Sequence, residues 1–147
     1  MEMRILFLDD NPERHRVFKQ RTIGCTVDSV FNADTCLEFL RKSGTEYDVI
    51  FLDHDLDATL ENKIVEGEKD GRYVVRKMIE EGITEGLVYT KIVIHSLNRP
   101  AAERMEAALK GAGIKEAKAI PFAWTTFTFD RHSKEISFPK AEVKSVR

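Results

Sequence analysis

Side chains that could bind a cation or a phosphate come directly after three apolar segments of the sequence. The segments are 4–8, 49–52 and 91–94, and each is rich in strand-forming residues. The side chains that follow them are Asp9 and Asp10, then Asp53, His54 and Asp55, and then His95, Ser96 and Asn98. Carboxylates suit Mg²⁺, Mn²⁺ and Ca²⁺, and imidazoles add Zn²⁺ and Fe²⁺. The three groups therefore indicate a site for a metal or a phosphate, if they meet in space.

Crowded carboxylates need a counter-charge, because like charges at short range repel strongly in a partly buried site. A divalent cation is the expected neutraliser, with Mg²⁺ or Mn²⁺ first and Zn²⁺ after them. Such a cation polarises a phosphoryl oxygen or lowers the pKa of a bound water. We therefore take Asp9, Asp10, Asp53 and Asp55 as the candidate metal ligands.

Basic and polar side chains nearby could bind a phosphate. Arg14 falls within the first two turns of the helix expected after Asp10, close enough to aim its guanidinium at a phosphate, and Arg99 is a weaker candidate. Ser96 has no obvious activating base, so we expect it to donate a hydrogen bond to phosphate rather than to attack it. Asn98 has the same expected role, although a residue two places before a proline also fits an ordinary helix N-cap.

Histidines fall into two classes. His95 and His54 follow strand ends and are candidates for proton transfer, with His54 an alternative for completing the metal shell or orienting water. His15 on a helix and His132 in a turn are interpreted as structural or solvent-facing.

These side chains can meet only if the segments before them are neighbouring strands. The uniformly apolar segment 49–52 is typical of a strand covered by helices on both faces. Strands are predicted at 4–8, 26–31, 49–52, 91–94 and 117–122, and helices at 12–22, from Asn32 or Asp34 to Ser43, at 71–81 and at 100–110. This alternation predicts a doubly wound parallel sheet. In a flavodoxin-like order, 2-1-3-4-5, the first, third and fourth strands are adjacent and their carboxyl ends form the ligand-binding edge.

The remaining segments frame this sheet. Residues 57–70 are polar and aperiodic, and we expect a long mobile loop over the strand ends. Residues 125–129 and 135–138 alternate around a turn at 131–134, which predicts a β-hairpin. We expect an α/β domain at 1–124, and a hairpin with a basic tail at 125–147 packed on it. On the fourth helix, Met105, Ala108 and Leu109 are expected to face the interior.

The composition fits a small cytoplasmic protein. The chain has 147 residues, of which 42% are hydrophobic and 33% charged, with a formal net charge of -2. No overall field attracts duplex DNA or an anionic membrane, and no segment approaches the length of a membrane span. Cys25 and Cys36 are expected to be reduced thiols. The hairpin is a candidate surface for a homodimer.

The acidic pair Asp9 and Asp10, with Asp53 and Ser96, resembles the receiver domain of response regulators. In that family the acidic pair binds Mg²⁺ and the strand-three aspartate accepts phosphate. Two features differ here, since Ile120 replaces the lysine that precedes the proline after strand five, the nearest lysine being Lys118, and a hairpin replaces the last helix.

The sequence is more similar to a divergent branch, the cyclic-phosphate-processing receiver-like family of bacteria and phages. The motifs that resemble it are Leu8-Asp9-Asp10 with Arg14, Leu52-Asp53-His54-Asp55-Leu56, and His95-Ser96-Leu97-Asn98. The resemblance implies the receiver fold and a metal-dependent phosphoesterase that acts on a cyclic nucleotide or a cyclic-phosphate RNA end. An alternative is a module that binds such a ligand without catalysis. A phosphoacceptor switch at Asp53 ranks last, because the lysine is absent.

Overall fold

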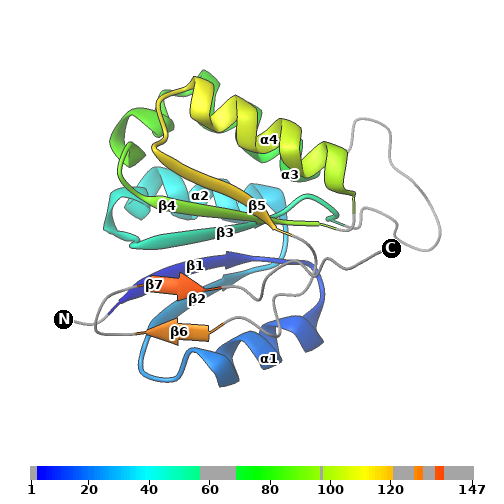
Figure 1. Ribbon diagram of the computed structural model, residues 1–147, viewed down its shortest axis with the longest axis vertical. Helices are drawn as coiled ribbons and strands as arrows, with labels where there is room; N and C mark the ends of the chain where they lie inside the picture. Colours follow the sequence, from blue (N-terminus) through cyan, green and yellow to red (C-terminus); the bar gives the residue numbers. More distant parts are fainter. Residues whose placement is uncertain (1–2, 57–68, 97, 121–127, 131–134, 138–147) are drawn as a thin grey trace.

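The computed structural model describes residues 3–56, 69–96, 98–120, 128–130 and 135–137. Its centre is a sheet of five parallel strands in the order β2-β1-β3-β4-β5 (Figure 1). The strands are β1 (Arg4–Leu8), β2 (Thr26–Val30), β3 (Val49–Asp53), β4 (Lys91–His95) and β5 (Glu116–Ile120). The predicted flavodoxin-like order is therefore confirmed.

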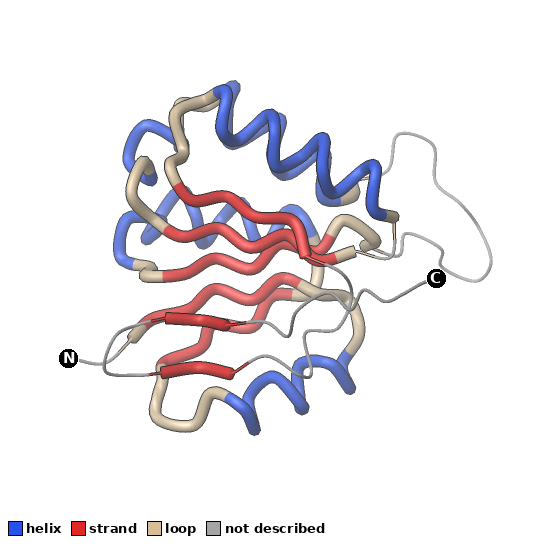
Figure 2. The backbone as a smooth tube through the Cα atoms, viewed as in Figure 1, coloured by secondary structure: helices blue, strands red, loops and turns tan. Residues whose placement is uncertain are grey.

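Four helices cover the two faces of the sheet. They are α1 (Pro12–Arg21), α2 (Ala33–Ser43), α3 (Gly71–Glu80) and α4 (Arg99–Gly111). Helix α1 lies on one face, and α2, α3 and α4 lie on the other (Figures 1 and 2). Each helix starts with a side-chain cap from Asn11, Asn32, Asp70 or Asn98, so Asn32 rather than Asp34 begins the second helix. Two short 3₁₀ helices, η1 (Gly44–Glu46) and η2 (Ile83–Leu87), were not predicted.

Strand alternation divides the core into two layers, because successive side chains point to opposite faces of a sheet. Leu6, Ile50 and Ile92 contribute to the layer that also contains buried residues of α2, α3 and α4. Phe7 and Phe51 belong to the other layer, with Phe18 of α1. Odd-numbered positions in β1, β3 and β4 therefore face α1.

The inner face of α4 differs from the prediction at one position. Met105 and Leu109 are buried, as expected, together with Ala101 and Ala102. Ala108 is exposed, because the helical repeat carries the buried stripe from Met105 to Leu109 and leaves Ala108 beside it on the solvent side. The prediction for Ala108 was wrong.

Two further strands, β6 (Thr128–Asp130) and β7 (Glu135–Ser137), pair antiparallel. The expected turn at 131–134 and the basic tail lie outside the described residues, as do residues 57–68 of the loop expected at 57–70. The full hairpin, its packing on the domain and its use in a homodimer stay predictions.

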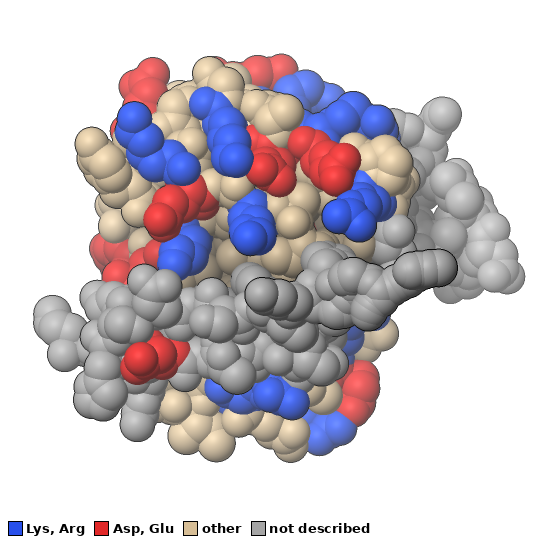
Figure 3. Space-filling view, viewed as in Figure 1, with Lys and Arg blue, Asp and Glu red and all other residues tan. Residues whose placement is uncertain are grey.

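Charges of both signs are interspersed on the face shown in Figure 3. On α4, Arg99 pairs with Glu103 at 3.1 Å, and Lys110 pairs with Glu106 at 2.8 Å. Among the described residues, this face therefore carries no extended patch of one sign.

Within the described part of the chain, no helix is both long and apolar enough to cross a membrane. Cys25 and Cys36 are free thiols.

The amino end of α3 lies directly on the backbone at the end of β3. The Gly71 amide donates to the His54 carbonyl over 3.2 Å. A Cβ atom on Gly71 would lie 2.6 Å from the His54 Cα, 2.7 Å from the Asp53 carbonyl oxygen and 2.8 Å from the Met105 Cε. Only glycine allows this approach, since two of these three neighbours are backbone atoms.

We expect Gly71→Ala to lower the free energy of unfolding by about 2–3 kcal/mol or more, because the methyl group forces α3 away from β3. Urea unfolding of the full chain measures the change. Gly111→Ala is the matched control: a Cβ there meets nothing within 4 Å, so the helix should become about 0.4–1 kcal/mol more stable. Equal stability of Gly71→Ala and the wild type would contradict the close approach.

Candidate metal centre

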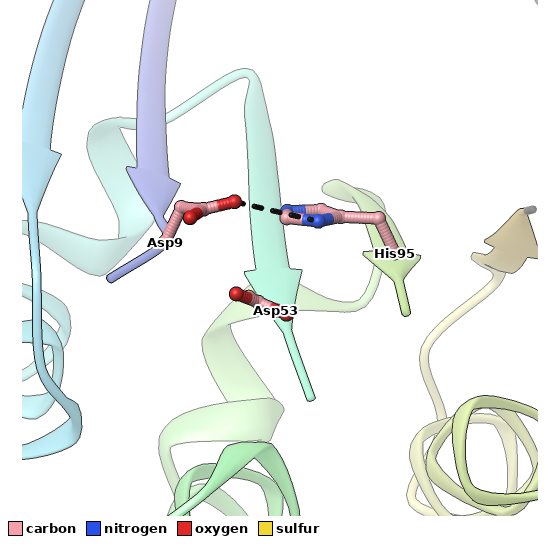
Figure 4. Close-up of side chains that lie close together, drawn as sticks. All are labelled: Asp9, Asp53 and His95. Carbon is pink, nitrogen blue, oxygen red and sulfur yellow. Dashed lines mark ion pairs between the residues drawn. The ribbon is translucent and has the colours of Figure 1, made fainter. Parts of the chain in front are cut away.

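Strand alternation and register bring Asp9, Asp53 and His95 together. Phe7 is in register with Phe51, and Asp53 is in register with His95. Asp9 extends the β1 ladder, because its amide donates to the Val30 carbonyl over 3.2 Å. All three side chains therefore continue the odd-numbered rows that face α1. One ligand atom from each lies within 4.8 Å of the others, and none of the three residues is exposed (Figure 4).

Asp9 is the member that has a positive partner. The Arg14 Nε donates to both carboxylate oxygens, at 3.1 Å from Oδ1 and 2.9 Å from Oδ2. The Asn11 amide donates to Oδ1 over 2.8 Å. Burial raises the pKa of Asp9, and the Arg14 guanidinium and the Asn11 amide act against that rise.

Asp53 is compensated on one oxygen only. The Asp55 amide donates to Oδ1 over 2.8 Å, while Oδ2 is buried and has no hydrogen-bond partner among the described residues. Burial raises the pKa of Asp53 to about 8, and the negative charge of Asp9 adds to the rise. A buried carboxylate oxygen without a donor is a place where a cation would be stabilising.

His95 offers a neutral imidazole to the same space. Its ring stacks on Phe7, with 5.6 Å between ring centroids, and its Nδ1 lies 3.8 Å from Asp9 Oδ2. Burial lowers the pKa of His95 to about 3, and the charge of Arg14 acts in the same direction. A neutral imidazole is the form that binds a metal, whereas a general acid at neutral pH needs the protonated form. Burial of the imidazole and its position within 4.8 Å of Asp9 and Asp53 therefore favour a ligand role over the predicted proton transfer.

The donor set fits a divalent cation. Two carboxylates and one imidazole suit Mn²⁺, Fe²⁺ or Zn²⁺ at least as well as Mg²⁺, which prefers oxygen ligands. Asp10 and Asp55, also predicted as ligands, are not in the group of three. Asp10 points an oxygen at the Arg14 guanidinium over 3.8 Å.

Asp55 joins two other predicted site residues at the rim of the sheet. One of its oxygens lies 2.7 Å from the His54 Nδ1, and the other accepts from the Ser96 hydroxyl over 2.8 Å. The His54 Nε2 lies 3.8 Å from a carboxylate oxygen of Asp70, the cap of α3. This network connects the ends of β3 and β4 with the start of α3, and it fixes the orientation of the His54 imidazole.

The remaining predicted residues have local partners. The Asn98 side chain accepts from the Ala101 amide over 3.1 Å, so the ordinary N-cap reading is correct for its oxygen. Arg99 is exposed and pairs with Glu103. His15 is buried, its Nε2 lies 2.7 Å from the Asp9 carbonyl oxygen and its ring stacks on Phe31, which agrees with a structural role.

Comparison with known proteins agrees with this architecture. The profile of a family described as the cyclic-phosphate processing receiver domain matches residues 4–111. No curated protein matches the chain.

Solved receiver structures share the fold. The chemotaxis protein CheY4 of Vibrio cholerae has a TM-score of 0.59 and 13% identity, over 84% of this chain and 88% of that one. A response regulator receiver domain protein of Methanospirillum hungatei has a TM-score of 0.55 and 16% identity, over 81% and 82%. The N-terminal domain of a receiver protein of Methanoculleus marisnigri has a TM-score of 0.53 and 22% identity, over 80% and 82%.

The raised pKa of Asp53 predicts a pH dependence of stability. Between about pH 4 and pH 8 the folded state holds a proton on Asp53 that the unfolded chain releases, so the free energy of unfolding falls as pH rises. In chelator, we expect Asp53→Asn to be more stable than the wild type at pH 8, by roughly a few kcal/mol, and equally stable at pH 4. Urea unfolding across this pH range measures the difference.

Asp34→Asn, at an exposed acid paired with Lys69, is the control and should leave the pH profile unchanged. A saturating divalent cation should stabilise the wild type at pH 8 but not Asp53→Asn. Lower stability of Asp53→Asn at pH 8 in chelator would contradict the buried, uncompensated charge.

Proposed function

Because the chain belongs to the cyclic-phosphate processing receiver domain family, we propose that it is a metal-dependent phosphoesterase that opens a cyclic phosphate on a nucleotide or an RNA end. The observation that carries the proposal is the buried group of Asp9, Asp53 and His95. Within it, Asp53 Oδ2 is buried and has no hydrogen-bond partner among the described residues. A purely structural core would gain from an apolar residue at that position.

In this proposal Asp9, Asp53 and His95 hold a divalent cation, and Asp10 is near enough in sequence to join them. The cation, when bound, supplies Lewis acidity toward a phosphoryl oxygen and lowers the pKa of a bound water. Burial of the three ligands excludes bulk water from their inner side. Asp55, whose oxygens are used by His54 and Ser96, positions these two side chains.

Opening of the ring consumes one water. The water oxygen forms a bond to phosphorus, one ring ester bond breaks, and the leaving oxygen takes a proton. We assign the proton transfer to His54, because its side chain lies at the rim, 12% exposed, and its Nδ1 is held by Asp55. Arg14, Ser96 and Asn98 remain the candidates for binding the phosphate oxygens.

The phosphoacceptor alternative loses support at the end of β5. Receivers place a lysine there, whereas Ile120 is buried here in the layer that contains Phe7 and Phe51, in register with His95. Lys118 is exposed on the same strand. Within the described residues, β5 therefore brings no ammonium group to neutralise an aspartyl phosphate.

The proposal is tested with a panel of cyclic mononucleotides, cyclic oligonucleotides and cyclic-phosphate RNA ends, each incubated with Mg²⁺, Mn²⁺ or Zn²⁺ and followed by mass spectrometry. We expect one substrate class to gain the mass of one water. Chelator should abolish the product. Asp53→Asn and His95→Ala should lower kcat by about 100-fold or more, since both remove ligands.

Asp34→Asn serves as the matched control for loss of a carboxylate and should keep full turnover. Tight binding of a cyclic nucleotide without any product would support the sequestering module instead. Turnover that persists in chelator would refute the metal-dependent reaction.

A further inference from the structure

Arg14 neutralises the carboxylate that the candidate metal centre needs. Its guanidinium contacts Asp9 through Nε, at 2.9 Å from Oδ2, and its terminal nitrogen lies 3.8 Å from Asp10. The same Asp9 Oδ2 lies 3.8 Å from the His95 Nδ1, on the side of the buried group. One carboxylate oxygen is therefore shared between an internal cation and the place where an external cation would bind.

Two cations on one buried carboxylate oppose each other. A divalent ion held by Asp9, Asp53 and His95 would bring two further positive charges close to a guanidinium that is only 25% exposed. Repulsion between two neighbouring positive charges is strong where water does not screen it. The Arg14 to Asp9 ion pair and the bound cation therefore compete for the same negative charge.

The local structure allows Arg14 to leave without unfolding the helix. Its backbone is fixed by the cap, because the Asn11 side chain accepts from the Arg14 amide over 3.2 Å. The side chain is long and partly exposed, and Asp10 offers a second acceptor at the rim. Moving the guanidinium away from Asp9 requires rotation of the side chain and leaves this cap bond in place.

We propose that Arg14 is an exchangeable counter-ion: a divalent cation displaces its guanidinium from Asp9, and the released guanidinium then binds the substrate phosphate. The second half rests on the proposed function, while the displacement does not. Displacement makes the two binding events cooperative, because cation binding frees the phosphate ligand and phosphate binding holds the guanidinium away from Asp9. By linkage, each ligand must tighten the other by the same factor.

The displacement is tested by Mn²⁺ titration followed by electron paramagnetic resonance on the full chain. Arg14→Ala should bind Mn²⁺ about tenfold more tightly than the wild type, because no internal cation has to be displaced. Arg16→Ala is the matched control: it removes the same charge from the same helix, at an exposed residue paired with Glu13, and should change the affinity by less than about twofold. Equal or weaker Mn²⁺ binding by Arg14→Ala overturns the proposal, as does an absence of Mn²⁺ binding in all variants.

Thermal unfolding gives a second readout. In chelator, Arg14→Ala should have a lower Tm than the wild type, because Asp9 is left buried without a counter-charge. Saturating Mn²⁺ should raise its Tm by more than it raises that of the wild type. If Arg14→Ala does not fold in chelator, Arg14→Lys is used, which retains the charge but not the fork, and should bind Mn²⁺ more tightly than the wild type by a smaller factor. Wild-type affinity in Arg14→Lys, with Arg14→Ala unfolded, would overturn the displacement.

Inorganic phosphate tests the coupling. It should tighten Mn²⁺ binding to the wild type and to Arg16→Ala by the same factor, and by a smaller factor in Arg14→Ala. An equal phosphate effect in all three proteins overturns the second half of the proposal. Failure of every cyclic phosphate to react, with the Mn²⁺ and phosphate results intact, refutes the phosphoesterase and leaves the counter-ion exchange standing.

Discussion

The structure depends on the burial of two carboxylates at the end of an apolar row. Asp9 and Asp53 follow Phe7 and Phe51 on the face of the sheet that α1 covers, and neither has access to water. Burial of a charge is unfavourable unless donors or cations surround it. The Arg14 guanidinium and the amides of Asn11 and Asp55 supply part of this compensation. Asp53 Oδ2, which no donor from the described part of the chain compensates, is what makes the site suited to a cation.

The alternation of side chains that buries these two aspartates also separates the predicted site residues into two groups. Odd-numbered positions at the ends of β1, β3 and β4 point toward α1 and form the dry group of Asp9, Asp53 and His95. His54, Asp55 and Ser96 follow the strand ends and form a hydrogen-bonded network at the rim, in which His54 and Asp55 are half-buried and Ser96 is buried. A single sheet edge thus carries a buried group that could hold a cation beside a separate hydrogen-bonded network.

The order and approximate bounds of the central strands were predictable from the sequence. All five strands of the central sheet were predicted, and the first was predicted with the bounds that β1 has. The roles of the individual motif residues were harder to predict, because a motif gives residue types but not the directions in which the side chains point. The parity of positions 9, 53 and 95 relative to the apolar rows would have grouped His95 with Asp9 and Asp53. The hydrogen bonds from Ser96 to Asp55 and from Arg14 to Asp9 depend on side-chain rotamers. Rotamers cannot be predicted from the periodicity of the sequence. The two 3₁₀ helices have too few residues to show a period.

The bond between the His54 carbonyl and the Gly71 amide fixes the two ends of the intervening chain within a few ångström of each other. For a segment whose ends are already joined, the entropy of closure rises only with the logarithm of its length, by about 0.6 kcal/mol for each doubling. Insertions and deletions between His54 and Gly71 would therefore disturb the positions of Asp9 and Asp53 very little. The placement of Asp53 at the end of β3 is therefore insulated from the length of the chain that joins β3 to α3.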